Sequence, residues 1–435
     1  MDGSDCDAVV LRQRVYRPYL DLGASIPEAP FHVIGLDWAI DAFLTARRYP
    51  FIQASVNESF RGELVTAPLG AYAVDSVRDI PSELWCPNTS LFVGKMDELD
   101  SLASEEGIAM IWALSRMGFH RAVCELVPRR AVAGDDLANP VEAELCYLFH
   151  WAQFRLWVDD PAVDYTPRGF RSIAEGAQPS RVKVDATYQM VMQTAKFSGD
   201  YDLCSRWQNR HERAIADYAP DANRNELDRL RSRYHRVGGF LPQMRQDKKG
   251  VTDEMAAAEE IIRSSSPADE FEEIARQEML FPCLESRMQE ALWIGDHDLA
   301  IARVTEYIEM KELDPKGWLH RANILVEMND YVSAAADFAM AAALAPPGRS
   351  VALFMRGQCL AASDDLEGAL DCYLRALDDD PLAISVVRAA LDAARSLGRR
   401  ATIPWFAARL EKLEAVAATS PEQAVEPYKS MQAPR

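Results

Sequence analysis

The last third of the chain repeats one pattern of small, large and polar positions. The segment NDYVSAAADFAMAAALAP, residues 329–346, is followed 35 residues later by DDLEGALDCYLRALDDDP, residues 364–381. When the two are aligned, small residues lie over small ones, an aromatic residue over an aromatic one, and proline over proline. Buried-type residues that recur every three or four positions predict a helix with one apolar face. The pattern therefore predicts the same amphipathic helix twice.

A further helix is predicted before each of these two. Trp318 and Ala322 align with Leu353 and Gly357 at the same offset, and a short polar turn follows each pair. Alanine or glycine lets two helices approach closely, and proline ends the second helix. A less regular copy surrounds the turn Gly295-Asp296. The sequence thus predicts three consecutive helical hairpins.

These hairpins resemble the tetratricopeptide repeat. The resemblance covers residues 282–381, and the residues that carry it are Trp318, Ala322, Tyr331, Ala334, Phe338, Ala341 and Pro346. It implies an α-solenoid in which each hairpin stacks on the next, because a single hairpin cannot bury its apolar face alone. It is specific for fold and says little about function.

Weaker hairpin signals extend the predicted solenoid in both directions. We expect degenerate hairpins over residues 101–281, including one around the Gly-Asp-Tyr turn at 199–201, and two more at about 101–132 and 141–175. Helices at about 383–397 and 402–417 are expected to form a degenerate repeat or a cap at the end of the array within 282–418, and residues 419–435 a flexible tail. The stretch Gly238–Gly250 and the SSSP run at 264–267 are predicted to be a loop or break.

The first hundred residues show a different pattern. FHVIGL and PFIQASV alternate like short strands on either side of a helix at 37–48, and two or three further strands follow. We therefore predict a small α+β domain over residues 1–100. The fold class predicted for the whole chain is mainly α, with this domain in front of the solenoid.

Composition and charge limit the kinds of partner that we expect the chain to bind. The chain has 435 residues, 49% of them hydrophobic, and a net charge of −20. An acidic chain is a poor binder of nucleic acid or anionic membranes, and no apolar run is long enough to cross a bilayer. Eight single cysteines without a CxxC pair are typical of reduced thiols, so we expect a cytoplasmic protein.

The resemblance also implies a binding surface. In tetratricopeptide arrays the first helix of each hairpin lines a concave groove that holds an extended peptide or a partner helix. The residues at the groove positions are Glu285, Gln289, Trp293, His320, Asn323, Glu327, Phe354, Met355 and Gln358. Asn323 occupies a carboxylate-clamp position of chaperone-binding members, but Leu319 and Gln358 replace the basic residues of that clamp. We therefore expect an internal peptide segment or a helix rather than a free C-terminus.

Two other groups of residues could carry chemistry. His120 and Cys124, with Cys146 and His150, form two pairs at one-turn spacing that could make a zinc site, although helical His and Cys are more often core or surface residues. The run RNELDRLRSRYHR, residues 224–236, could hold phosphate or RNA. Alternatively, some of its arginines pair with Glu226 and Asp228 along the same helix, and the acidic segment 251–315 docks against the rest.

No catalytic signature is present. The sequence has no P-loop, GxGxxG, GxSxG or HExxH motif, and it indicates no cofactor and no metal. The function predicted is that of an adaptor or scaffold for a protein or peptide partner. The alternative is an enzyme, or the accessory subunit of one, in a bacterial biosynthetic or modification pathway, with a site between residues 30–95 and the solenoid. The oligomeric state stays open.

Overall fold

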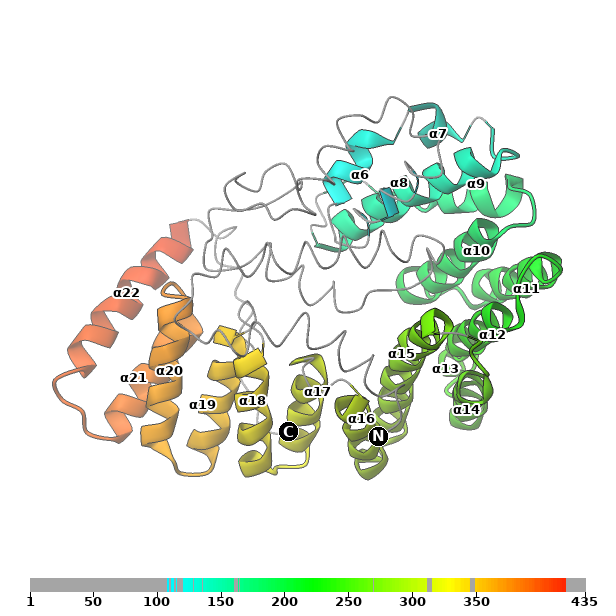
Figure 1. The fold of residues 1–435 in the computed structure, drawn as a ribbon. Helices are drawn as coiled ribbons and strands as arrows, with labels where there is room; N and C mark the ends of the chain where they lie inside the picture. Colours follow the sequence, from blue (N-terminus) through cyan, green and yellow to red (C-terminus); the bar gives the residue numbers. More distant parts are fainter. Residues whose placement is uncertain are drawn as a thin grey trace. The chain divides into compact units, whose positions relative to one another are not determined.

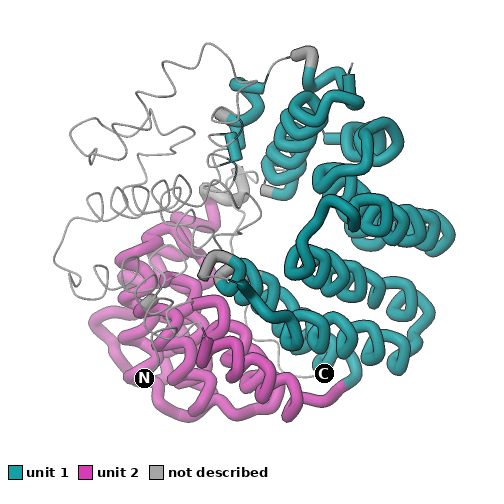
Figure 2. Tube along the Cα trace, turned by 45° about the vertical axis from the view of Figure 1, so that its right-hand side comes forward, with its two compact units in different colours: residues 1–65, 69–294 teal, residues 66–68, 295–435 magenta. Residues whose placement is uncertain are grey.

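The computed structural model describes residues 108, 111–112, 115, 120–127, 129–134, 136–159, 163, 165–268, 270–310, 315–344 and 349–419. The chain forms two compact units, which we describe separately (Figure 2). Unit 1 contains the described residues up to Ile294, and unit 2 those from Gly295 onward. The α+β domain predicted for residues 1–100 and the tail predicted for 419–435 fall outside the described residues, apart from Thr419 itself.

The regular secondary structure of the described residues is helical in both units and includes no strand (Figure 1). Within each unit, consecutive helices pack on one another in chain order, which is the arrangement expected of helical repeats. The helices of unit 1 are α6 (His120–Leu126), α7 (Arg129–Ala133), α8 (Pro140–Asp159), α9 (Arg168–Gly176), α10 (Arg181–Gln193), the π-helical turn η4 (Thr194–Ser198), α11 (Tyr201–Tyr218), α12 (Arg224–Gly238), α13 (Phe240–Met244), α14 (Lys248–Ser264) and α15 (Glu270–Ile294). Those of unit 2 are α16 (His297–Met310), α17 (Pro315–Glu327), α18 (Tyr331–Leu344), α19 (Arg349–Ala362), α20 (Leu366–Asp379), α21 (Ile384–Ser396) and α22 (Ile403–Thr419).

The hairpins of unit 2 confirm the repeat register. Ala322, Ala334 and Ala369 are completely buried, and the aromatic rings of Phe338 and Tyr373 fill the space beside them. A Cβ added at Gly357 would lie 2.5 Å from the ring of Tyr373, so α19 and α20 can approach this closely only with glycine there. The small positions of the sequence pattern are therefore the helix contacts.

One turn design recurs at the start of several helices. A residue in the left-handed backbone region is followed by an aspartate whose side chain accepts a hydrogen bond from the backbone three residues later. This caps the first turn of the following helix. The pairs are Gly199-Asp200, Gln246-Asp247, Gly295-Asp296, Asn329-Asp330 and Asp364-Asp365.

Unit 1 is less regular. Its hairpin of α8 and α9 matches the one expected at about 141–175, and α11 begins at the predicted Gly-Asp-Tyr turn. The loop predicted over Gly238–Gly250 is wrong, because α13 and the start of α14 occupy most of it. The SSSP run does separate α14 from α15. Helix α15 is 25 residues long, includes Pro282, and passes through the 281/282 position at which the sequence suggested a boundary.

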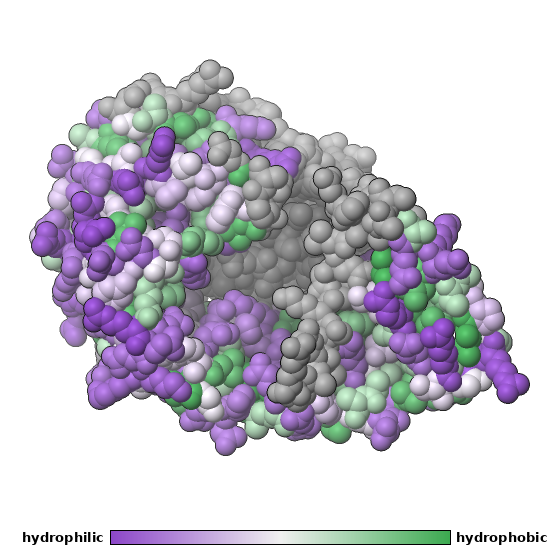
Figure 3. All heavy atoms as spheres, turned by 180° about the vertical axis from the view of Figure 1, so that it is seen from behind, coloured by the Kyte–Doolittle hydropathy of each residue, from purple (hydrophilic) through white to green (hydrophobic). Residues whose placement is uncertain are grey.

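The surface mixes hydrophobic and charged residues. On the face shown in Figure 3, hydrophobic residues of the described chain lie singly or in small groups between hydrophilic ones. The large exposed hydrophobic residues include Val332 and Leu382 of unit 2. None of the described helices combines the length and apolar character that a membrane span requires.

Candidate functional site

The predicted groove residues of unit 2 lie on the first helices of two neighbouring hairpins. Asn323 and Glu327 of α17 are exposed and one turn apart, and His320 of the same helix is half-buried. Met355 and Gln358 of α19 are half-buried as well. Helices α17 and α19 share one core cluster, in which Ala322 and Cys359 are buried. Both helices therefore pack against the same core cluster.

Half-buried apolar side chains lie between the polar ones. Leu319 of α17 and Met355 of α19 each pack against two core clusters of unit 2, yet neither is fully covered. The core fixes one side of each of these side chains, and the other side exposes apolar atoms to solvent. This arrangement favours contact with another chain. We name Leu319, His320, Asn323, Glu327, Met355 and Gln358 the α17–α19 surface.

One predicted groove residue is placed differently. Phe354 is only 1% exposed and packs against Tyr373, with their ring centres 5.9 Å apart. The neighbouring Ala352 and Leu353 are equally buried. Because α19 is packed between α18 and α20, more than one side of it is covered, and position 354 belongs to the core. Phe354 cannot anchor a partner while the hairpin is folded.

The remaining predicted groove residues lie in unit 1. Gln289 is exposed, and Glu285 and Trp293 are half-buried, all on α15 at four-residue spacing that puts them on one side of the helix. They belong to the other compact unit and are therefore a separate set.

Glu327 of unit 2 has a close neighbour in its own unit, since its carboxylate lies 3.4 Å from Nε2 of His297.

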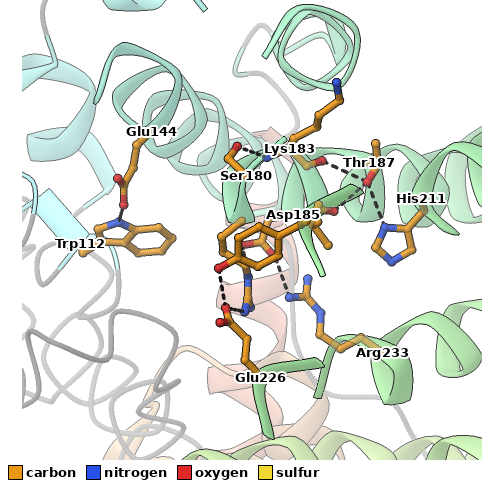
Figure 4. Close-up of polar contacts among 12 residues, drawn as sticks. Trp112, Glu144, Ser180, Lys183, Asp185, Thr187, His211, Glu226 and Arg233 are labelled. Carbon is orange, nitrogen blue, oxygen red and sulfur yellow. Dashed lines mark hydrogen bonds and ion pairs between the residues drawn. The ribbon is translucent and has the colours of Figure 1, made fainter. Parts of the chain in front are cut away.

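The basic run 224–236 forms ion pairs with a neighbouring helix (Figure 4). Asp185 of α10 lies between two guanidinium groups, 3.0 Å from Nε of Arg181 and 2.6 Å from Nη1 of Arg233. Glu226 of α12 accepts from Arg181 at 3.0 Å and from the Tyr218 hydroxyl at 3.2 Å. Of the pairs expected along the helix, Arg231 lies 4.0 Å from Asp228. The network instead ties α12 to α10.

Burial and the arginine charges together set the pKa values in and beside this network. Burial alone would raise the pKa of Asp185, but Arg181 and Arg233 outweigh it and hold the pKa below its usual range. Next to it, burial lowers the pKa of His211 to about 3, and Arg233 acts in the same direction. His211 is therefore a neutral ring whose Nδ1 lies 2.9 Å from the Thr187 hydroxyl. Long-range pairing of this kind leaves no local signal in the sequence.

The His and Cys pairs lie on packed helices but do not form a metal site. In the part of the chain that the structure describes, no three His, Cys, Asp or Glu side chains are grouped closely enough to hold a metal ion. Burial raises the pKa of Cys124 to about 11 and that of Cys146 to about 12, so both thiols stay protonated. The ring of His150 lies against Gly169 and close to Phe170, as a packing residue does.

Comparisons with known proteins add little to these observations. No model of a known protein family and no curated protein matches the sequence. Among solved structures, a monomeric mutant of IFIT1 with Gppp-AAAA matches with 12% identity over 95% of this chain and 96% of the other, at a TM-score of 0.40. The structure of Naa15/Naa10 bound to HypK-THB matches with 13% identity over 94% of this chain and 75% of the other, at a TM-score of 0.31.

At TM-scores this low, neither likeness supports an argument about this chain. The architecture rests on its own helices, turns and buried small residues. They identify the protein as a helical repeat protein.

Proposed function

We propose that this protein is a scaffold that binds a peptide segment or a helix of a protein partner on its α17–α19 surface. The observation that carries the proposal is the position of Leu319 and Met355, which are fixed in two core clusters and still reach the surface. Asn323 and Gln358 supply amide groups that can bond a peptide backbone. Apolar anchors with polar neighbours are typical of peptide-binding faces.

The net charge and the free thiols bear on the kind of partner and on the cellular compartment that we propose. The net charge of −20 favours partners with basic segments, mainly through their rate of association. The described cysteines are free thiols, five of them buried, which supports a reducing compartment and hence the cytoplasm.

A peptide-library selection on the intact protein tests the proposal. We expect enrichment of sequences with apolar residues at fixed spacing, and binding of the consensus peptide measured by fluorescence polarisation. The double variant Asn323→Ala, Met355→Ala should weaken that binding by roughly 2–4 kcal/mol, because both side chains would be central anchors.

The matched control removes exposed apolar side chains elsewhere in unit 2. Val332→Ala with Leu374→Ala changes α18 and α20, where these residues are 72% and 43% exposed, and should leave peptide affinity unchanged. A consensus peptide that bound the Asn323/Met355 variant as tightly as wild type, with its helicity intact by circular dichroism, would remove the α17–α19 surface as the site.

A further inference from the structure

A tyrosine of unit 1 lies between two arginines. Tyr188 is on α10, and Arg233 and Arg236 lie one turn apart on α12, so both guanidinium groups reach it. Nη2 of Arg236 donates to the Tyr188 hydroxyl at 2.9 Å. The guanidinium carbon of Arg233 lies 4.0 Å from the centre of the same ring. This arrangement concentrates positive charge around one phenol oxygen.

The two arginines differ in their hydrogen-bond partners. Arg233 has a carboxylate partner in Asp185. The hydrogen bond of Arg236 goes to the uncharged Tyr188 hydroxyl, and its Nη1 is buried with no hydrogen-bond partner among the described residues. A buried guanidinium nitrogen without an acceptor costs free energy unless a group from outside the chain satisfies it.

Charges of both signs lie around Tyr188. Arg181 and Arg233 pair with the carboxylates of Asp185 and Glu226, and the charge of Glu285 acts on Arg236. Burial alone would raise the pKa of Tyr188, yet Arg236, Arg233 and the more distant Lys196 lower it. A phenol in such a field is a strong hydrogen-bond donor to an anionic oxygen.

We propose that Tyr188, Arg233 and Arg236 form a binding site for the phosphate group of a small molecule. One phosphate oxygen would accept from Nη1 of Arg236 and a second from the Tyr188 hydroxyl, with Arg233 held beside them by Asp185. A phosphate monoester fits better than a carboxylate because it carries more negative charge and more acceptor oxygens.

A small molecule fits better than a nucleic acid. Asp185 and Glu226 flank the site, and their carboxylates would repel the neighbouring phosphates of a polyanion. The acidic charge of the whole chain acts in the same direction. It does not prevent binding of one phosphate, since exposed charges beyond about 8 Å are largely screened at physiological salt.

Isothermal titration calorimetry of the full-length chain with inorganic phosphate, at constant ionic strength, tests the site. We expect saturable binding by the wild type that weakens at least about tenfold in Arg236→Gln, because a charge-assisted hydrogen bond is lost. Tyr188→Phe keeps the ring beneath Arg233 and should also weaken binding. The matched control is Arg210→Gln, which removes an exposed arginine paired with Glu175 at 2.6 Å and should bind phosphate like wild type.

Three outcomes would overturn the proposal. Absence of saturable phosphate binding by the wild type is the first. Equal weakening in Arg210→Gln and Arg236→Gln is the second, because it would indicate a general charge effect. Tighter binding of a single-stranded RNA than of phosphate, lost in Arg236→Gln, is the third and would assign the site to nucleic acid. If circular dichroism shows that Arg236→Gln does not fold, the Tyr188→Phe variant becomes the test. Unchanged phosphate affinity in Tyr188→Phe would then reject the site.

Discussion

At the scale of single residues, His211 shows how burial sets the state of a side chain. The ring is completely buried between α10, α11 and α12, close to the rings of Tyr188 and Tyr234. Burial and the nearby Arg233 favour the neutral form over the charged one. The ring thus serves packing and a hydrogen bond to Thr187 rather than proton transfer near neutral pH.

We expect His211 to make unfolding sensitive to mild acid. Its pKa is 6.5 when unperturbed and about 3 in the folded chain, so the unfolded state binds the extra proton between these values. The stability that the neutral ring contributes is complete above the unfolded pKa and is lost as the pH falls below it. Each pH unit below about 6 should cost the wild type about 1.4 kcal/mol that His211→Gln does not lose.

Urea unfolding of both proteins from pH 7 down to about pH 4 measures this difference. The comparison uses the slopes of stability against pH, so a constant loss of stability in His211→Gln does not matter. Parallel curves for the two proteins would show that the ring is protonated in the folded state.

At the scale of elements, α10 and α12 are joined by buried ions as well as by apolar contacts. The side chains of Asp185 and Arg233 are only 11% and 13% exposed, and Asp185 serves two arginines. In contrast, Arg210 and Glu175 form a similar 2.6 Å pair at about half exposure on the surface of the same unit. The Asp185–Arg233 and Glu175–Arg210 ion pairs thus have the same N–O distance and differ mainly in burial.

We expect these two pairs to differ strongly in their contribution to stability. Asp185→Asn should destabilise the protein by roughly 3–5 kcal/mol, because it leaves Arg233 and Arg181 buried without their shared counter-ion. Glu175→Gln should cost less than about 1 kcal/mol, because water screens an exposed pair. Chemical denaturation of the two variants beside wild type measures both values. A loss of similar size in both would mean that the α10–α12 network is open to solvent.

How much of this could be predicted from sequence differs between elements. In unit 2 the small positions Ala322, Ala334 and Gly357 and the aromatic positions Phe338 and Tyr373 follow from the repeat pattern, because they act within one hairpin. Phe354 could not be placed in this way, because its burial depends on how two neighbouring helices cover α19 together.

The polar residues of unit 1 were harder to predict for the same physical reason. Arg233 and Asp185 are 48 positions apart, so helical spacing says nothing about their contact. Spacing along one helix predicted partners on that helix, as Arg231 has in Asp228, but it could not predict partners on another helix. The helices at 240–244 and 248–264 were missed because Gly238, Gly239 and Pro242 are typical of loops, whereas here they lie at helix ends or in a first turn.

At the scale of the whole molecule, the two units each have a core of their own. The clusters of unit 2 consist of residues from α17 to α22, with Phe354, Tyr373 and Val387 among those buried. A second set of buried residues, including Phe170 and Trp207, belongs to unit 1. A unit whose apolar residues are covered by its own helices can fold as a domain.

We therefore expect a fragment of residues 295–435 to fold alone. Its circular dichroism spectrum should be helical, and its thermal unfolding should be cooperative. A fragment of residues 331–435, which lacks α17, should be much less stable because Ala334 and Phe338 lose the helix that covers them. A 295–435 fragment that remained unfolded in dilute buffer would show that unit 2 depends on unit 1.

The turn of a left-handed residue and a capping aspartate has a consequence for how such a chain can change in evolution. Each copy of the turn lies directly before a helix and carries the signal that begins it, at Asp200, Asp247, Asp296, Asp330 and Asp365. A stretch of DNA that encodes one hairpin can therefore be duplicated or deleted together with this signal. The length of the array can then change by a whole hairpin without compensating mutations in the hairpins on either side.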